Sequence, residues 1–454
     1  MEVSKKTLTY TSLVLIHILL GIVIFLNTKI SVIYSIAILS LSFLILLKTQ
    51  NKKNEVLFVA AYAVGSEIVL RMAGGFLFYE IAKYSIVFFM LMGIYFSGFS
   101  KNSFLYWVFL LSLIPGVLVA SVTLNLNANI IKSLSFNLSG PLCLGICSMY
   151  CYQRRITLKD LDHLMLTMLL PLLTAVTYMY LYNPSIKNVI TSTESNFETS
   201  GGFGPNQVST MIGLAIFLMF TRVIFYSKER WVIVLNITLL MILTFRGLVT
   251  FSRGGMICSA IMVALLILVL FFVTKRKAKI KIIWSIVFSL IALTAIWMYS
   301  SEQTNGLIDK RYANQDKGGR VKESILTGRE VIMEGEFEMF LQNPIMGIGI
   351  GKAKEYRLDT FGEVIASHNE ITRMMAEHGA FGVLALLILI MTPLTLYINN
   401  RQHIYLLSFF TFWILTINHA AMRLAAPAFV YALSLVQVYI VEKAKDNPVI
   451  EELE

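Results

Sequence analysis

The stretch GGMICSAIMVALLILVLFFV, residues 254–273, indicates the fold class because it carries no charged side chain over 20 positions. An α-helix needs about 20 consecutive apolar residues to cross the hydrocarbon core of a bilayer. The whole chain of 454 residues has the same character: 57% of its residues are hydrophobic, 14% are charged, and the mean hydropathy is +0.72. Because soluble domains carry about 25% charged residues, this composition excludes an ordinary soluble enzyme and predicts an all-α polytopic membrane protein.

Hydropathy and helix-breaking residues together predict fourteen membrane-spanning segments. The first has no small-residue cleavage site behind it, so we expect it to be retained as an anchor. The hairpins at 56–98 and 403–441 have the weakest signals. The predicted spans are residues 8–27, 30–47, 56–73, 79–98, 104–122, 138–152, 160–182, 206–226, 231–250, 254–273, 282–299, 379–398, 403–419 and 424–441.

Basic residues in the short loops predict the orientation, because cytoplasmic loops carry an excess of Lys and Arg. If the N terminus is inside, the inner loops collect most of these residues, including the run from Lys275 to Lys281. The outer short loops hold little beyond Lys29, Lys132 and Lys187. Both termini are therefore predicted to be cytoplasmic. The net charge of +11 is then a topology signal, and no nucleic-acid partner is expected.

One long polar loop divides the chain into three predicted parts. Residues 1–299 form an N-terminal transmembrane bundle, residues 300–378 form a large loop, and residues 379–454 form C-terminal helices with a short tail. The orientation places the loop outside the cytoplasm. Loops of this length in compact proteins are usually functional or disordered.

The long loop has predicted helical structure of its own. Residues 329–341 have helical periodicity, and the expected apolar face consists of Met333, Phe337, Phe340 and Leu341. Asn343-Pro344 ends this helix. A glycine-rich stretch, 347–351, follows, and a second helical run begins near Ser367 and continues into the next span.

Arg253 directly precedes the uncharged 20-residue stretch, whose helix N-terminus faces outward in the predicted orientation. The free N–H groups and the dipole of a helix N-terminus favour an anion. Gly254 and Gly255 would let a ligand approach the backbone closely. These residues predict a phosphate site at the outer face, with Arg246 and Arg423 as secondary anion candidates. The alternative is an interfacial arginine that extends to the lipid headgroups.

Two polar positions of the long loop could complete such a site. Arg329 is either a second anion ligand or half of a surface ion pair with Glu330 or Glu334. His368 lies just before the helix that enters the membrane, where a neutral imidazole can accept a proton from a sugar hydroxyl near pH 7. The alternative is a loop histidine without a role.

The residues after His368 offer further polar groups. Asn369 could orient the imidazole or the acceptor. Arg373 and Glu377 lie four residues apart on the predicted helix, which allows an ion pair. Arg373 is also a candidate substrate ligand.

The sequence predicts neither a metal ion nor a cofactor. The long loop contains no Asp-x-Asp pattern, and of Glu334, Glu336 and Glu338 only the first and the last share a helical face. The three cysteines of the predicted span 138–152 lie on one apolar face without the polar shell that a metal site needs. We expect them to be buried thiols.

Glu67 and Arg71 lie four residues apart inside a predicted span. Ionisable residues within a membrane are functional candidates by default. The spacing also allows an ion pair, and a satisfied structural pair is the preferred interpretation.

The motifs of the second half resemble the signature of the O-antigen ligase and O-antigen polymerase superfamily. The pattern His-Asn, nine residues, Gly-x-x-Gly is met by His368, Asn369, Gly379 and Gly382. Three more segments are similar to family motifs: Ser252-Arg253-Gly254-Gly255, Thr327-Gly328-Arg329 followed by Asn343-Pro344-Ile345-Met346-Gly347-Ile348-Gly349, and Gly204-Pro205-Asn206-Gln207. The resemblance implies a GT-C-like membrane fold with about twelve spans, so twelve to fourteen helices are expected.

The resemblance also implies an activity and its residues. Such enzymes take a glycan from undecaprenyl diphosphate and pass it to an acceptor hydroxyl outside the bacterial cytoplasmic membrane, without a metal or cofactor. Arg253 and Arg329 would bind the diphosphate, and His368 would activate the acceptor. Substrate-binding roles are expected for Asn369, Arg246, Gly254, Gly255, Asn206 and Arg373. The expected partners are the lipid-linked donor, a glycan acceptor and membrane lipid; whether a chain-length regulator joins them stays open.

The leading interpretation is a polymerase that joins lipid-linked repeat units of a surface polysaccharide, such as O-antigen, capsule or exopolysaccharide. One alternative is a ligase that moves finished glycan to lipid A core or to a protein. Ligation to lipid A core requires an outer membrane, for which the sequence gives no sign. A lipid-linked oligosaccharide flippase is the alternative from another class. A flippase should show charges in a central cavity and related halves, whereas here the charges gather at the outer face and no internal repeat is found.

Overall fold

The computed structural model describes residues 5–125, 129–227, 229–274, 276–324, 329–362, 367–419 and 422–440. Within these ranges the chain is α-helical apart from two short 3₁₀ helices, one two-stranded sheet, one isolated bridge and the connecting turns. Ten of the described helices are long and apolar enough to cross a membrane. The prediction of an all-α polytopic membrane protein is therefore confirmed.

The elements follow one another in this order. The first half contains α1 (Lys5–Leu26), α2 (Lys29–Thr49), α3 (Glu55–Met72), α4 (Ile81–Ser97), η1 (Lys101–Ser103), α5 (Phe104–Ser112), α6 (Ile114–Thr123), α7 (Ile130–Cys151), β1 (Arg155–Thr157) and α8 (Leu158–Tyr182). The second half contains η2 (Glu198–Ser200), α9 (Pro205–Tyr226), α10 (Arg230–Leu248), α11 (Arg253–Val273), α12 (Arg276–Gln303), α13 (Leu307–Tyr312), α14 (Arg329–Gln342), α15 (Lys352–Phe361), α16 (Glu370–Asn399), α17 (Leu406–Ile417), α18 (Ala426–Leu433) and β2 (Gln437–Tyr439).

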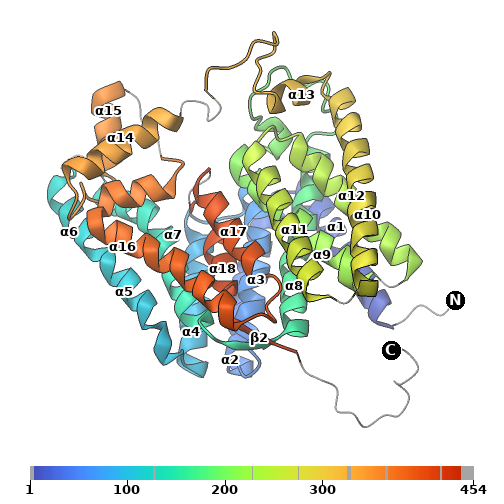
Figure 1. Ribbon diagram of the computed structural model, residues 1–454, viewed down its shortest axis with the longest axis horizontal. Coiled ribbons are helices and arrows are strands. Elements are labelled where there is room, and N and C mark those ends of the chain that lie inside the picture. The colour runs from blue at the N-terminus through green and yellow to red at the C-terminus, as the bar shows by residue number, and fades with distance from the viewer. Residues whose placement is uncertain are drawn as a thin grey trace.

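The two ends of the helical bundle differ (Figure 1). The short helices α13, α14 and α15 lie at one end, which we call the loop end, and β2 lies at the opposite end, where it pairs in parallel with β1. The spanning helices α8 and α9 are the most deeply buried. Glycines let neighbouring helices approach them: a Cβ on Gly65 of α3 would collide with the backbone of α8, and one on Gly255 of α11 with the backbone of α9.

Each predicted span contains a helix, but the described residues contain ten candidate spans rather than the expected twelve to fourteen. The helices at predicted spans 56–73, 79–98, 403–419 and 424–441 are not among the ten. Two predictions of extent are also wrong. Helix α7 begins at Ile130, eight residues before the predicted 138, because polar serine and asparagine side chains lower its hydropathy without preventing a helix. The predicted span 424–441 contains only the eight residues of α18, followed by β2. At about 1.5 Å per residue, α18 is roughly 12 Å long and cannot cross a membrane. Its residues are all buried.

Buried charged side chains of α3 and α4 form hydrogen bonds with the backbone that leads into α18. Glu67 Oε2 accepts a hydrogen bond from the N–H of Ala425 at 2.8 Å, and Lys83 Nζ donates to the carbonyl of Met422 at 3.4 Å. A carboxylate is favourable at a helix N-terminus, and non-helical backbone at membrane depth is tolerated only where protein surrounds it. Glu67 also pairs with Arg71 at 2.7 Å, as the sequence predicts.

Replacing Glu67 with alanine is expected to destabilise the protein by about 3–5 kcal/mol, because the buried guanidinium of Arg71 would lose its counter-ion. The N–H of Ala425 would lose its acceptor as well. The midpoint of thermal unfolding in detergent measures the effect. Glu338→Ala is the control, since Glu338 is exposed on α14. Equal midpoints for the two variants would show that the buried pair does not stabilise the fold.

Candidate active site

Four arginines from separate elements lie at the loop end. Arg253 is the first residue of α11, Arg311 lies in α13, Arg329 is the first residue of α14, and Arg423 precedes α18. The guanidinium of Arg253 donates a hydrogen bond to the carbonyl of Arg311 at 3.5 Å. We refer to these four residues as the arginine cluster.

The arginine cluster contains more positive charge than nearby carboxylates offset. Burial lowers the pKa of Arg329, and the charges of Arg423 and Arg253 lower it further. Burial also lowers the pKa of Arg311, with Arg253 as the next cause. In the described ranges, Arg311 pairs with Glu194 at 3.8 Å, but Arg329 and Arg423 form no ion pair. Partly buried positive charge without a counter-ion is costly, so the cluster favours a bound anion.

His368 lies beside the arginine cluster in a pocket of about 390 Å³, part of it open to solvent. Burial, and then the charges of Arg423 and Arg329, lower the pKa of His368 to about 4, so the imidazole is neutral near pH 7. Its Nδ1 atom is buried and has no hydrogen-bond partner among the described residues. A bound ligand can provide the hydrogen-bond partner that such a buried nitrogen lacks. The pocket is lined by Arg329, Ile332, Met333, His368, Asn369, Asn418 and His419.

Asn369 fixes the start of α16 directly after His368. Its Oδ1 accepts hydrogen bonds from the N–H groups of Ile371 at 2.8 Å and Thr372 at 3.3 Å. Its Nδ2 donates to Asn418 Oδ1 at 3.2 Å. Asparagine is a preferred N-cap because its side chain satisfies such free N–H groups. The cap and the contact with Asn418 hold the His368 peptide in place.

The buried face of helix α14 is not the face that the sequence predicts. Phe337 is 46% exposed, so the predicted apolar face is not the buried one. Glu336 is fully buried instead: it accepts hydrogen bonds from Thr372 Oγ1 at 2.6 Å and Ser367 Oγ at 3.2 Å, and pairs with Arg357 at 2.9 Å. The prediction fails because α14 packs on α15 and α16 through polar side chains. Glu336 thereby ties α14 to the segment that carries His368.

Glycines of two motifs join α16 to the chain after α14. Gly379 has a φ of +60° and interrupts α16, and a Cβ there would lie 2.6 Å from the backbone nitrogen of Gly347. The N–H of Ala380 donates to the carbonyl of Pro344 at 2.7 Å. Glycine alone tolerates both this conformation and this approach. Thr327 and Gly328, which precede Arg329 in its motif, lie outside the described residues.

A comparison with protein-family models gives a match within the second half of the chain. Residues 238–387 match the protein-family model described as O-antigen ligase. The match covers 150 of the 454 residues and shows a similarity to that family. It includes Arg253, Arg329 and His368, which the structure places at the same end of the bundle. No curated protein matches the chain. The resemblance expected from the sequence is confirmed, and an O-antigen ligase or polymerase type of function is supported in general terms.

The segment Ser252-Arg253-Gly254-Gly255 packs tightly on its neighbours. A Cβ on Gly254 would collide with the ring of His419, and one on Gly255 with the carbonyl of Ser209. The serine that precedes α11 donates to Asn206 Oδ1 at 2.8 Å. Protein atoms thus occupy the positions beside both glycines, and this packing fixes the start of α11. Substrate contacts by Asn206, Gly254 and Gly255 stay predictions.

Arg246 makes its contacts with protein groups outside the arginine cluster. Its Nη2 donates to the carbonyl of Asn183 at 2.9 Å, and its guanidinium lies over the ring of Tyr180, 3.8 Å from the centroid. In the described ranges, Arg246 forms no hydrogen bond or ion pair with the four clustered arginines or with His368. Sequence position near the outer end of α10 did not predict this orientation of the side chain.

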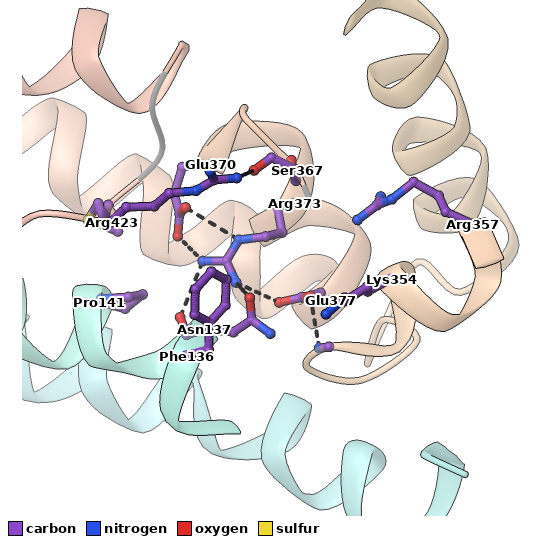
Figure 2. Close-up of a pocket in the computed structure, with 12 residues that line it drawn as sticks. Phe136, Asn137, Pro141, Lys354, Arg357, Ser367, Glu370, Arg373, Glu377 and Arg423 are labelled. Atoms are coloured by element: carbon purple, nitrogen blue, oxygen red, sulfur yellow. Dashed lines mark hydrogen bonds and ion pairs between the residues drawn. The ribbon is translucent and has the colours of Figure 1, made fainter. Parts of the chain in front are cut away.

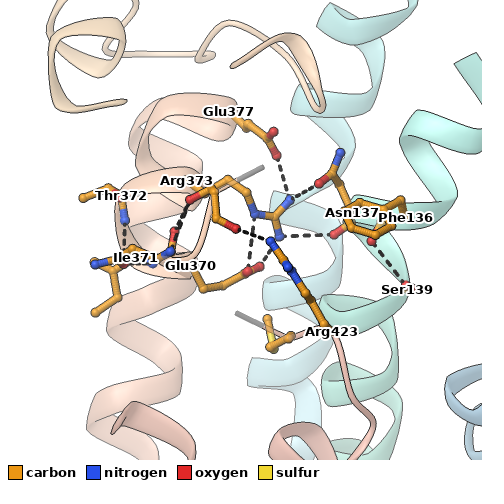
Figure 3. Close-up of polar contacts among 12 residues, drawn as sticks. Phe136, Asn137, Ser139, Glu370, Ile371, Thr372, Arg373, Glu377 and Arg423 are labelled. Carbon is orange, nitrogen blue, oxygen red and sulfur yellow. Dashed lines mark hydrogen bonds and ion pairs between the residues drawn. The ribbon is translucent and has the colours of Figure 1, made fainter. Parts of the chain in front are cut away.

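Arg373 is held by protein groups on several sides (Figure 3). It pairs with Glu370 and with Glu377, the latter at 3.0 Å, and Nη1 donates to Asn137 Oδ1 at 2.9 Å. The predicted pair of Arg373 and Glu377 is therefore confirmed. A substrate contact by Arg373 stays a prediction.

Sequence reasoning missed two residues that border the site. Arg311 lies in a polar loop segment that matches no motif, and His419 follows the end of α17. His419 Nε2 lies 3.0 Å from Thr210 Oγ1, and its carbonyl accepts a hydrogen bond from Arg329 Nη1 at 3.4 Å. Neither residue has a local pattern that could reveal it, because both reach the site through tertiary packing.

The described residues include no group of three or more His, Cys, Asp or Glu side chains that could hold a metal ion. The cysteines of α7 are buried and form no disulfide bonds. Metal-independent chemistry stays a prediction, which the activity assay described below can test.

Proposed function

We propose that the protein is a polymerase of surface-polysaccharide repeat units. It transfers a glycan from undecaprenyl diphosphate to a hydroxyl of another lipid-linked unit at the outer face of the bacterial cytoplasmic membrane. The observation that carries the proposal is the arginine cluster beside the neutral imidazole of His368. A diphosphate leaving group needs positive charge, and a hydroxyl nucleophile needs a base.

The proposed reaction forms one bond and breaks one. The acceptor oxygen bonds to the anomeric carbon of the donor sugar, and the bond from that carbon to the diphosphate oxygen breaks. The electron pair stays on the diphosphate, where Arg253 and Arg329 stabilise the charge through paired N–H donors. His368 accepts the proton of the acceptor hydroxyl. Guanidinium groups take the place that a metal ion would have in neutralising the diphosphate.

A ligase that moves finished glycan to lipid A core or to a protein is the second candidate. The matching family model is described as O-antigen ligase, but the match does not distinguish a ligase from a polymerase. Polymerase and ligase would use the same donor, so they differ in the acceptor. We favour the polymerase because ligation to lipid A core requires an outer membrane, for which the sequence gives no sign.

Purified protein in detergent, incubated with the lipid-linked repeat unit of its host, tests the proposal. A ladder of longer lipid-linked glycans on a gel would support the polymerase. Transfer only after addition of lipid A core or a protein acceptor would support the ligase. Flipping of the lipid in vesicles without any transfer would contradict both. A parallel reaction with EDTA tests the metal: we expect the same ladder, whereas a loss restored by one added cation would contradict a metal-free reaction.

The pH dependence of transfer should report the charge around His368. A base acts in its unprotonated form, so a pKa of about 4 in the unbound protein should keep kcat/KM constant down to about pH 5. A bound diphosphate would offset the charge of Arg329, which raises the pKa of His368. The acid limb of kcat should therefore lie at higher pH than that of kcat/KM. Initial rates between about pH 4 and 8 measure both; coincident limbs near the usual histidine pKa of about 6.5 would contradict this.

A further inference from the structure

A second pocket adjoins the His368 pocket, and we call it the α7–α16 pocket (Figure 2). Its empty space is about 500 Å³, part of it open to solvent. Helices α7, α15 and α16 and the segment before α18 form its walls. Ser367 and Glu370 line this pocket, while His368 and Asn369 line the other, so one short segment separates the two.

The α7–α16 pocket contains two carboxylates in fixed positions. Arg373 pairs with both Glu370 and Glu377, and Glu377 Oε1 also accepts the N–H of Gly351 at 2.8 Å. Their contacts hold these carboxylates without using all of their acceptor positions. Fixed carboxylate oxygens are suited to accept hydrogen bonds from the hydroxyl groups of a sugar.

Two cations of the α7–α16 pocket have no carboxylate partner within 4.0 Å in the described part of the chain. They are Lys354, in the first turn of α15, and Arg423, which Figure 2 shows on the opposite side of the pocket. Arg423 Nη2 donates to the carbonyl of Ser367 at 3.0 Å, directly before His368. Phe136 is 40% exposed and gives the wall an apolar ring.

We propose that the α7–α16 pocket binds the acceptor glycan, and that Lys354 and Arg423 select an acceptor sugar that carries a carboxylate. The proposal rests on the proposed function, because it concerns the second substrate of the same site. A transfer reaction needs an acceptor hydroxyl close to the base. A polar pocket that shares a wall with His368 meets this need. Its two cations without a carboxylate partner would pair with the carboxylate of an acidic sugar.

The test uses an acceptor analogue, the host's repeat unit on an alkyl glycoside, which cannot act as a donor. Initial rates with the normal lipid-linked donor give the KM for this analogue. We expect Lys354→Gln to raise that KM about tenfold, because a hydrogen bond to a charged group is lost, and to affect kcat less. Reduction of the acceptor carboxylate to an alcohol should raise the KM of the wild type by a similar factor. The same reduced acceptor should hardly raise the KM of Lys354→Gln any further.

Lys352→Gln is the matched control, because Lys352 pairs with Glu355 at 2.8 Å and does not line the pocket. An unchanged KM in Lys354→Gln, equal effects of the two variants, or a host repeat unit without an acidic sugar would overturn the proposal. In each case the wild type would still transfer glycan. Failure of the proposed function would look different, because the wild type would then transfer glycan to no acceptor.

Discussion

Replacing His368 with alanine is expected to lower glycan transfer about 10²–10⁴-fold, because the acceptor hydroxyl would lose its general base. The protein should still insert and remain folded, since the cap of α16 is formed by Asn369 and the buried contacts of α14 by Glu336. Polymer length in cells and initial rates with purified protein measure the effect.

His163→Ala is the control for the His368 variant. His163 is exposed in the first turns of α8, next to β1 and far from the loop end. This variant should make polymer like the wild type. Normal polymer from His368→Ala, at the expression level of His163→Ala, would show that His368 is not the base.

Replacing Arg329 with alanine is expected to lower transfer about 10²–10³-fold, because a donor that stabilises the developing charge of the leaving group is lost. Arg329→Lys should recover part of the rate. An ammonium keeps the charge, but it lacks the planar pair of donors that fits a phosphate. The measurement is the single-turnover rate with labelled lipid-linked donor, so that product release does not limit it.

Arg320→Ala is the matched control for Arg329, because Arg320 is exposed in the same loop. Both variants change the charge of the loop by one unit. Equal effects would mean that Arg329 acts through the general charge of the loop rather than as a ligand. A fully active Arg329→Ala would exclude it from the donor site.

The hydropathy pattern predicted the membrane bundle well where a helix is set by its own segment, as in α11. It failed at α18, where tertiary contacts end the helix. Asn400 Nδ2 donates to the carbonyl of Val436 at 2.7 Å, and its Oδ1 accepts the N–H of Val438 at 3.3 Å. These bonds and the pairing with β1 draw the chain into β2. No property of residues 424–441 alone reveals partners so distant in the sequence.

The candidate site was predicted in part, for a similar reason. Arg253, Arg329 and His368 each stand in a recognisable motif, and the structure places all three near one another at the loop end. Arg311 and His419 stand in no motif, because helix packing alone brings them there. Helix packing also decides which way a side chain points. An arginine near the end of a helix can face the site or can face a tyrosine, and the spacing of residues in the sequence does not distinguish these two orientations.

A cryo-electron microscopy structure with undecaprenyl diphosphate, the leaving product of the proposed reaction, would test the donor site most directly. We expect both phosphates to lie within hydrogen-bond distance of Arg253 and Arg329, with the imidazole of His368 facing the position of the departed sugar. Phosphates bound elsewhere, for example beside Arg246, with none at the arginine cluster, would contradict this assignment of the active site.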